Sequence, residues 1–386
     1  MRYAIMLLVL VIAFSGIAFA QEEPVKEKET PVVEVVFVLD TTGSMSGLIE
    51  GAKRKIWSIV NHIADGEPTP DIKVGLVGYR DRGDDYVTKI VDLSGDLDDV
   101  YSKLRKFSAG GGGDTPESVN QALSEAVTKI SWSTDDKSLR VIFLVGDCPP
   151  HMDYDNDVKY KDSCKEAVKR DIIINTIQCG GHSATVPFWQ EIARLSEGTY
   201  VQIKQSGGVV SVDTPYDEEL AKLSRELDKT VVFAGKKELR DAEAKRLKKA
   251  DACTGGDVGA AADRAAFKGK SGPASPSARA TDLVQKAAEG ELNLGKMKEE
   301  ELPEEMKKMS GEEREKYIEE KKLKREEVQK KIEELGKKRE AYIEKELKKR
   351  SGSKDSFDKK VIESVKKHAA KKGIEYDNEE KTEKDK

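Results

Sequence analysis

The chain has 386 residues, of which 37% are hydrophobic and 36% are charged, with a formal net charge of −5. This length is sufficient for two domains. A nucleic-acid-binding protein carries a clustered basic excess, so the near balance of 67 basic and 72 acidic residues argues against a nucleic-acid partner.

The first 20 residues have the pattern of an export signal. Arg2 precedes an almost wholly apolar run, and Ala18-Phe19-Ala20 fits a cleavage site before Gln21. We therefore predict a signal peptide at 1–20, a charged leader at 21–31 and a periplasmic or extracellular mature protein. The alternative is an uncleaved membrane anchor, since the apolar run is nearly long enough to span a bilayer.

From Val32 the chain alternates strand patterns with helix patterns. β-Branched runs predict strands at 32–40, 71–79, 86–91, 139–146, 171–178 and 199–203. Amphipathic stretches predict helices at 45–63, 96–107, 116–130, 160–170, 188–195 and 218–227. This alternation predicts a doubly wound, mostly parallel, Rossmann-like α/β sheet, with a domain at 32–230.

The remainder of the chain is more polar. Residues 231–300 are rich in Ala, Gly and Lys and read as a linker with short helices, and 301–386 read as a charged α-helical region. A capping box at Ser310 opens a Glu/Lys helix that runs to about Arg350. Val328 and Ile332 follow coiled-coil spacing, but Arg339 lies on the same seam. We therefore expect a solvated helix, and leave open a coiled coil or association with a partner through this region.

Oxygen-bearing side chains lie in three loops that we expect at one edge of the sheet. Asp40, Thr42 and Ser44 follow the first strand, Asp147 follows the strand at 139–146, and Thr115 follows a run of glycines. The carboxyl ends of parallel strands meet at one edge of a sheet, where ligands bind. Carboxylates and hydroxyls are hard ligands, which predicts a site for Mg²⁺, or else Mn²⁺ or Ca²⁺. The alternative role for Thr42 and Ser44 is helix capping.

These residues also carry a family resemblance. Asp40-x-Thr42-Gly-Ser44, Gly112-Gly-x-Thr115 and Asp147 resemble the metal-ion-dependent adhesion site of von Willebrand factor type A domains, over roughly residues 32–206. The resemblance implies that Thr42, Ser44 and Thr115 face the ion, and that the aspartates coordinate it directly or through water. It further implies a cell-adhesion type of binding, in which an acidic side chain of a partner protein completes the coordination.

The cysteines allow two interpretations. Cys148-Pro-Pro-His151 and Cys179-Gly-Gly-His182 offer two Cys and two His, which is a set of ligands for zinc. Export instead favours a disulfide between Cys164 and Cys179.

Two other classes of function compete with metal-dependent adhesion. A structural envelope protein would act through its helical tail, and a metal-dependent hydrolase would use Asp147 and His151 beside the ion. The chain has neither a His-Glu-x-x-His helix nor a Gly-x-Ser-x-Gly elbow, so we expect no enzymatic activity. An Arg82-Gly83-Asp84 tripeptide, an integrin-ligand pattern, lies in a predicted turn, and the turn is the favoured interpretation.

Overall fold

The computed structural model describes residues 30–254, 256–273, 275–349 and 356–376. The predicted signal peptide and almost all of the predicted leader lie outside these residues. Within the described ranges, no helix combines the length and the apolar character needed to cross a bilayer.

A six-stranded sheet forms the centre of the N-terminal half. Its order is β3 (Thr88–Ser94), β2 (Asp71–Tyr79), β1 (Val32–Asp40), β4 (Leu139–Gly146), β5 (Ile172–Cys179) and β6 (Tyr200–Ile203). Only β2 and β3 pair antiparallel. The predicted doubly wound sheet is confirmed, and β1, β2 and β4 begin and end at the predicted residues.

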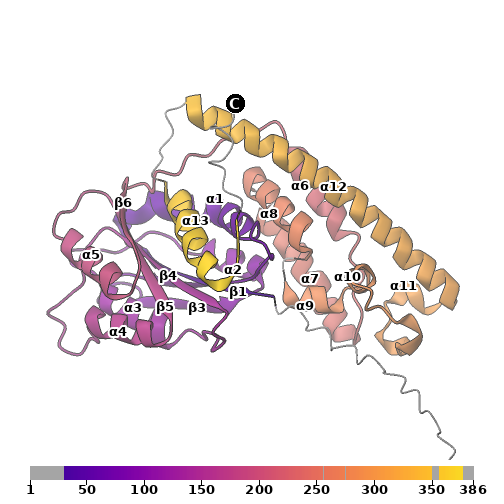
Figure 1. Cartoon of the computed structure of the whole chain (residues 1–386), viewed down its shortest axis with the longest axis horizontal. Coiled ribbons are helices and arrows are strands. Elements are labelled where there is room, and N and C mark those ends of the chain that lie inside the picture. The colour runs from indigo at the N-terminus through magenta and orange to yellow at the C-terminus, as the bar shows by residue number, and fades with distance from the viewer. Residues whose placement is uncertain (1–29, 255, 274, 350–355, 377–386) are drawn as a thin grey trace, which may run out of the picture.

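Helices cover both faces of this sheet (Figure 1). On one face lie α1 (Ser46–Ile63), α2 (Leu97–Leu104) and α13 (Phe357–Ala369); on the other lie α3 (Val119–Thr128), α4 (Tyr160–Lys169) and α5 (Val186–Leu195). Side chains of β1 alternate between the two cores, with Val35 and Phe37 in the first and Val36 and Val38 in the second. This two-residue period makes β1 apolar on both faces, as expected of a central parallel strand.

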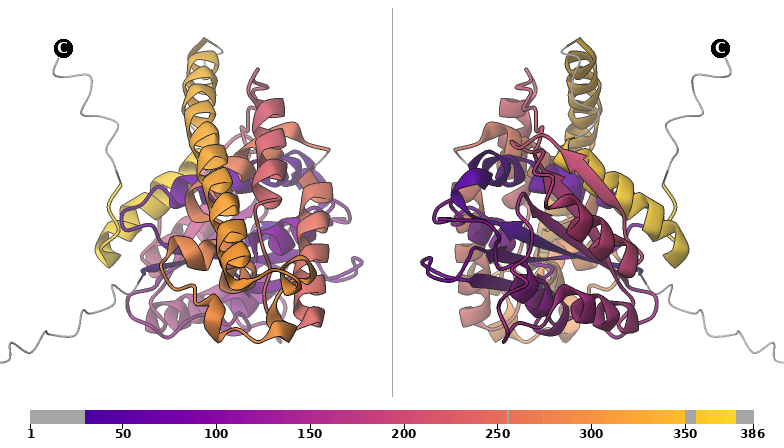
Figure 2. Two further views of the ribbon diagram at one scale, coloured as in Figure 1. Left: turned by 90° about the vertical axis from the view of Figure 1, so that its right-hand side faces the viewer. Right: turned by 90° about the vertical axis from the view of Figure 1, so that its left-hand side faces the viewer.

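A helical region follows the sheet and packs against one side of the α/β domain (Figure 2). It comprises α6 (Asp217–Asp228), α7 (Lys237–Thr254), α8 (Val258–Ser271), α9 (Pro276–Thr281), α10 (Leu283–Ala288), α11 (Glu304–Lys307) and α12 (Gly311–Lys349). Short 3₁₀ helices lie at Gly43–Met45, Leu294–Lys296, Glu299–Glu301 and Ala370–Lys372.

The expectation of a linker with short helices at 231–300 is corrected in one respect, because α7 and α8 are helices of 18 and 14 residues. Phe267 of α8 packs 5.9 Å from Trp57 of α1, between ring centroids. The buried face of α8 consists largely of alanines, Ala260, Ala262 and Ala265 among them. Alanine has the highest helix propensity but little apolar area, so a buried Ala-rich helix resembles a linker in sequence.

The long helix α12 is not solvated along its whole length, which corrects a second expectation. Val328 and Ile332 are buried against α6 and α8. Arg339, which interrupts the apolar seam, forms 2.6 Å ion pairs with Asp217 of α6 and Asp263 of α8. These residues of α12 therefore serve packing within the chain, and association of this region with a partner stays a prediction.

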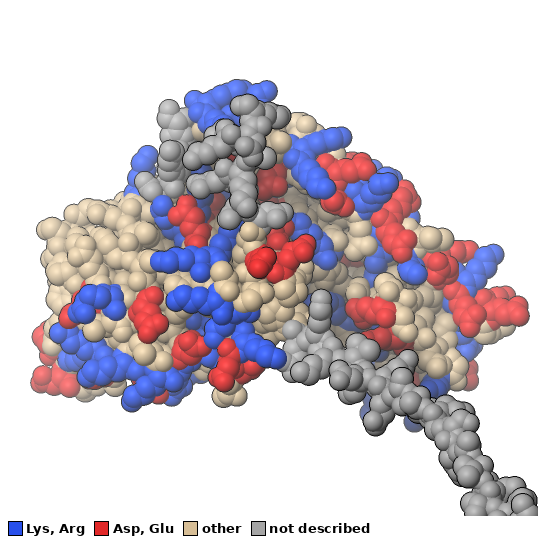
Figure 3. Space-filling model, in the orientation of Figure 1, with Lys and Arg blue, Asp and Glu red and all other residues tan. Residues whose placement is uncertain are grey.

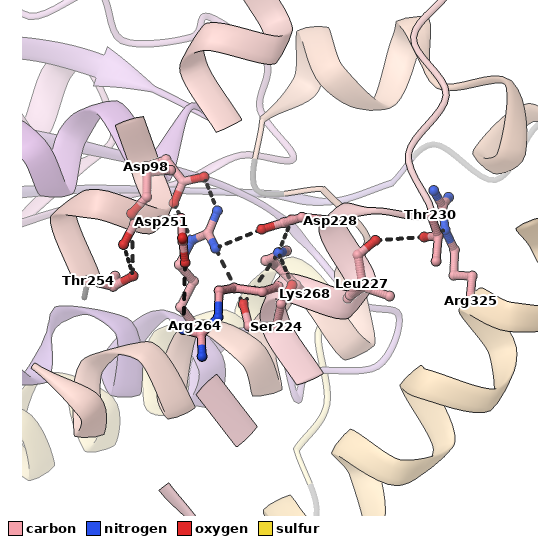
Figure 4. A network of polar contacts seen from close by, with 12 residues as sticks. Asp98, Ser224, Leu227, Asp228, Thr230, Asp251, Thr254, Arg264, Lys268 and Arg325 are labelled. Carbon is pink, nitrogen blue, oxygen red and sulfur yellow. Dashed lines mark hydrogen bonds and ion pairs between the residues drawn. The ribbon is translucent and has the colours of Figure 1, made fainter. Parts of the chain in front are cut away.

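A buried charge network joins the helical region to the α/β domain (Figure 4). The guanidinium of Arg264 in α8 donates to both carboxylate oxygens of Asp98 in α2, at 2.6 and 2.7 Å. Asp228 of α6 lies 3.5 Å from Arg264 and also pairs with Lys268. Burial lowers the pKa of Lys268 to about 8, and the charge of Arg264 contributes to this. Two cations and two anions thus balance one another away from water.

Helix α13 belongs to the α/β core, although the sequence places it in the charged tail at 301–386. Phe357 packs 5.9 Å from Phe37 of β1, between ring centroids, and Val361 and Val365 lie in the same core. After the helix, Glu375 exchanges two 2.8 Å backbone hydrogen bonds with Glu67. One face of the sheet is therefore completed by residues that follow β6 by some 150 positions.

Candidate metal site

The first loop of the site joins β1 to α1. Asp40 is fully buried, and its Oδ1 accepts hydrogen bonds from the backbone N–H of Thr42, at 2.8 Å, and from its hydroxyl, at 2.6 Å. The hydroxyls of Thr42 and Ser44 lie 3.3 Å apart. The two hydroxyls and the carboxylate therefore converge, while Asp40 Oδ2 has no hydrogen-bond partner. Neither Thr42, which precedes the 3₁₀ helix at Gly43–Met45, nor Met45, which precedes α1, makes a side-chain capping bond.

The second loop begins at Asp147, at the end of β4. Its Oδ2 accepts a 2.7 Å hydrogen bond from Gln205, whereas its Oδ1 is buried without a partner. Burial raises the pKa of Asp40 to about 7; hydrogen bonds from Thr42 oppose this shift, and the nearby carboxylate of Asp147 adds to it. Two carboxyl groups thus lie side by side, each with one unsatisfied oxygen.

The third loop differs from expectation, since α3 begins at Val119 and not at Pro116. Backbone bonds between Glu117 and the loop after β4 hold this segment extended: its N–H donates to Pro149, and its carbonyl accepts from His151, both at 3.0 Å. Thr115 is exposed here, and its role as a ligand stays a prediction.

Glu117 is the residue that the sequence reasoning missed. It is 2% exposed, and its Oε2 has no hydrogen-bond partner. Burial raises its pKa to about 9, with the charge of Asp40 as the next cause, followed by those of Asp81, Asp84 and Asp147. The sequence signal was present only as an acidic residue two positions after Thr115.

The turn that contains Arg82-Gly83-Asp84 contacts the other loops at this edge of the sheet. Arg82 forms a 2.5 Å ion pair with Asp157, and its guanidinium lies 3.9 Å from the centre of the Tyr154 ring. Both carboxylate oxygens of Asp84 accept from the backbone N–H of Gly112, at 3.2 and 3.1 Å. The tripeptide is therefore engaged inside the molecule, in agreement with its interpretation as a turn.

The cysteine interpretations are corrected. All four cysteines are free thiols. Cys164 belongs to the core on the α4 side of the sheet and Cys179 to the core on the α1 side, so the sheet itself separates the proposed disulfide partners.

The alternative zinc site is not assembled either. In the part of the chain that the structure describes, no three His, Cys, Asp or Glu side chains are close enough to hold a metal ion by themselves. His182 Nδ1 pairs with the hydroxyl of Thr185, at 3.0 Å. His151 lies between Asp153, 2.8 Å from Nδ1, and Asp81, 3.3 Å from Nε2. Both ring nitrogens of His151 thus face carboxylates.

The rim around the acidic centre consists mostly of small uncharged residues. Figure 3 shows few charged side chains on the surface over β6 and the loops beside it. The exposed rim residues are Gly43, Ser44, Ser46, Gly47, Gly111–Thr115, Gly181–Ala184 and Lys204–Ser206, of which only Asp114 and Lys204 carry a charge.

The donor set fits a hard divalent cation. Two carboxylate oxygens, of Asp40 and Asp147, are buried without hydrogen-bond partners beside the hydroxyls of Thr42 and Ser44. No ion pair joins either carboxylate to a Lys or Arg among the residues described. Unpaired buried charge is destabilising, and a cation would remove it. Mg²⁺ is typically bound by one or two carboxylates and keeps several waters, which suits a site with so few protein ligands.

A doubly wound sheet with such an oxygen site at its carboxyl edge defines a class of ligand-binding α/β domain. Residues 34–212 match the family model of the von Willebrand factor A domain, and this part of the chain is a von Willebrand factor A domain. Domains of this family are typically non-enzymatic protein-interaction modules, and they often bind a divalent metal.

Individual relatives are similar to part of the chain. The von Willebrand factor A domain-containing protein 7 of Rattus norvegicus is 38% identical over 121 residues, which are 31% of this chain and 12% of the relative. The chain covers 19% or less of the length of its curated relatives.

Solved structures are similar over somewhat less than half of the chain. Proximal thread matrix protein 1 of the mussel byssus, with a zinc-occupied site, is 14% identical with a TM-score of 0.36, covering 46% of this chain and 42% of that one. A von Willebrand factor type A protein of Catenulispora acidiphila is 16% identical with a TM-score of 0.36, covering 47% and 40%.

Proposed function

We propose that this protein binds a partner protein through a divalent cation, Mg²⁺ in the first place, at the edge formed by Asp40, Thr42, Ser44 and Asp147. The observation that carries the proposal is the pair of buried, unpartnered carboxylate oxygens beside two hydroxyls. Asp40 and Asp147 balance the charge of the ion, and Thr42 and Ser44 add neutral oxygens. When bound, the cation supplies an open coordination position for an oxygen of the partner.

The surroundings favour an acidic side chain as the group that the partner presents. The rim is made largely of glycine, serine and other small residues, so a partner backbone can approach closely. Because the rim carries little positive charge, the cation would dominate the attraction of a carboxylate. The N-terminal sequence supports an exported protein, acting in the periplasm or outside the cell.

Thermal unfolding with Mg²⁺ and with EDTA tests the cation site. We expect Mg²⁺ to raise the melting temperature of the wild type and to leave that of Asp40→Ala unchanged, because ligand binding to the folded state alone stabilises it. Asp114→Ala is the matched control, since Asp114 is an exposed carboxylate on a neighbouring loop. Equal Mg²⁺ responses of the wild type and Asp40→Ala would refute the site.

Capture of partners from the native source tests the binding mode. Partners that are retained with Mg²⁺ and lost with EDTA, and that Asp40→Ala fails to retain, would support the proposal. Capture that persists in EDTA would instead indicate contact through the helical region.

A further inference from the structure

Besides Asp40 and Asp147, Glu117 has a buried carboxylate oxygen without a hydrogen-bond partner, and unlike Asp157, whose other oxygen pairs with Arg82, it has no ion pair among the described residues. The acidic residues next to it are satisfied by neutral donors. Asp81 accepts from the hydroxyls of Ser118, at 2.7 Å, and Tyr154, at 2.9 Å, and Asp84 accepts from Gly112. Buried polar groups are almost always hydrogen-bonded, so the free oxygen of Glu117 calls for a ligand.

Glu117 and Thr42 both lie next to Gly112. A Cβ atom on Gly112 would lie 3.1 Å from Cβ of Thr42 and 3.5 Å from Oε1 of Glu117. Gly112 therefore lies close to both side chains, and a Cβ here would make a tight contact with Thr42. Its φ of +77° is also one that residues with a Cβ rarely adopt. The Glu117 carboxyl is thus held on the Thr42 side of the cation site.

Direct ligation is not what the arrangement indicates. Among the described residues, no three carboxylates, His or Cys are close enough to share one ion, so Glu117 lies beyond the ligands themselves. A carboxylate just outside the set of direct ligands can accept hydrogen bonds from water molecules that the ion carries. Mg²⁺ keeps several waters when it binds proteins, whereas Ca²⁺ more readily replaces them with protein oxygens.

We propose that Glu117 is a positioning residue of the cation site, whose carboxylate holds water ligands of the ion and thereby favours Mg²⁺ over Ca²⁺. The proposal rests on the proposed cation site and adds to it a determinant of ion preference. Outer hydrogen-bonding partners of metal ligands typically contribute about 10- to 100-fold to affinity.

Isothermal titration of the full chain with Mg²⁺ and, separately, with Ca²⁺ tests this role. We expect Glu117→Gln, which keeps the shape of the side chain, to lose about 10-fold or more in Mg²⁺ affinity and about threefold or less in Ca²⁺ affinity. Glu125→Gln is the control: Glu125 is also buried, but it hydrogen-bonds to Thr88, at 2.6 Å, and Lys129, at 2.8 Å. It should leave both affinities unchanged.

The outcomes separate this role from a structural one and from failure of the site as a whole. An equal loss for both ions would mean that Glu117 only supports the loop, and would overturn the proposal. The proposal would also be overturned if Glu117→Gln bound Mg²⁺ as tightly as the wild type while Asp40→Ala abolished binding. In that case the proposed cation site would still be supported. Absence of cation uptake by the wild type would overturn both. Melting in EDTA checks that each variant is folded.

Discussion

The backbone N–H of Phe357 donates a 2.9 Å hydrogen bond to the carbonyl oxygen of Gly207. Gly207 lies just after β6, and Phe357 opens α13, which packs on the sheet beside α1. The intervening chain, with the helical region in it, therefore leaves and re-enters the α/β domain at one point. In three dimensions the helical region is an insertion before the last helix of the domain.

If α13 is part of the core, then Phe357→Ala should destabilise the whole α/β domain. Phe357 is 1% exposed and packs against Phe37. Loss of a buried phenylalanine side chain typically costs about 3–5 kcal/mol. Denaturant unfolding of the full chain measures this, with Leu323→Ala on the exposed face of α12 as the control, expected to change stability by less than ~0.5 kcal/mol. Similar small effects of both substitutions would contradict the assignment of α13 to the core.

Removal of one member of the buried charge network should be far more damaging than removal of a surface pair. Arg264→Met leaves Asp98 and Asp228 buried without this cation, for which we expect a loss of about 3–5 kcal/mol. Arg225 lies 4.0 Å from Asp251, and both side chains are partly exposed, so Arg225→Met should cost less than ~1 kcal/mol. Urea unfolding compares the two variants, and a loss for Arg264→Met no larger than the control would argue against a role of the network in stability.

Asp84 should contribute to the cation site without touching the ion, because its carboxylate holds the backbone N–H of Gly112. Hydrogen bonds of this kind contribute about 1 kcal/mol, so we expect Asp84→Ala to weaken Mg²⁺ binding about 3- to 10-fold. Asp85→Ala serves as the control, since the neighbouring Asp85 side chain is 89% exposed. Titration calorimetry measures both, and an unchanged affinity of Asp84→Ala would rule out this support.

Acid should weaken the docking of α13 through His368. This histidine is 2% exposed, and neither ring nitrogen has a hydrogen-bond partner. Burial lowers its pKa, and the charges of Lys371 and Lys367 lower it further, against a small opposing effect of Glu197. The unfolded chain then binds a proton more readily than the folded one.

The lower pKa of His368 in the folded chain sets the direction of the pH dependence of stability. The stability due to His368 is fully present above the unfolded pKa of about 6.5 and is lost as the pH falls towards the lower folded pKa. His368→Gln should therefore flatten the decline in melting temperature between about pH 6.5 and pH 5. His182→Gln, at an exposed position, should retain the decline. The same slope in His368→Gln as in the wild type would exclude this residue as its source.

The sequence by itself determined the sheet and most of the candidate site. The β-branched runs of β1, β2 and β4 are buried on both faces, and that local pattern places their ends and hence Asp40 and Asp147. The hydroxyls of Thr42 and Ser44, two and four residues beyond the end of β1, can be recognised without knowledge of distant contacts.

Only the tertiary structure decided which distant segments meet. Export favours a disulfide between Cys164 and Cys179, but Cys164 of α4 lies in the core on one face of the sheet and the side chain of Cys179 in β5 points into the core on the other face. The alanines of α8 and the short apolar stripe of α13 carry too little apolar surface to predict their burial, which depends on partners 200 or more residues away. Glu117 joins the site because its backbone pairs with Pro149 and His151, a contact that no local pattern encodes.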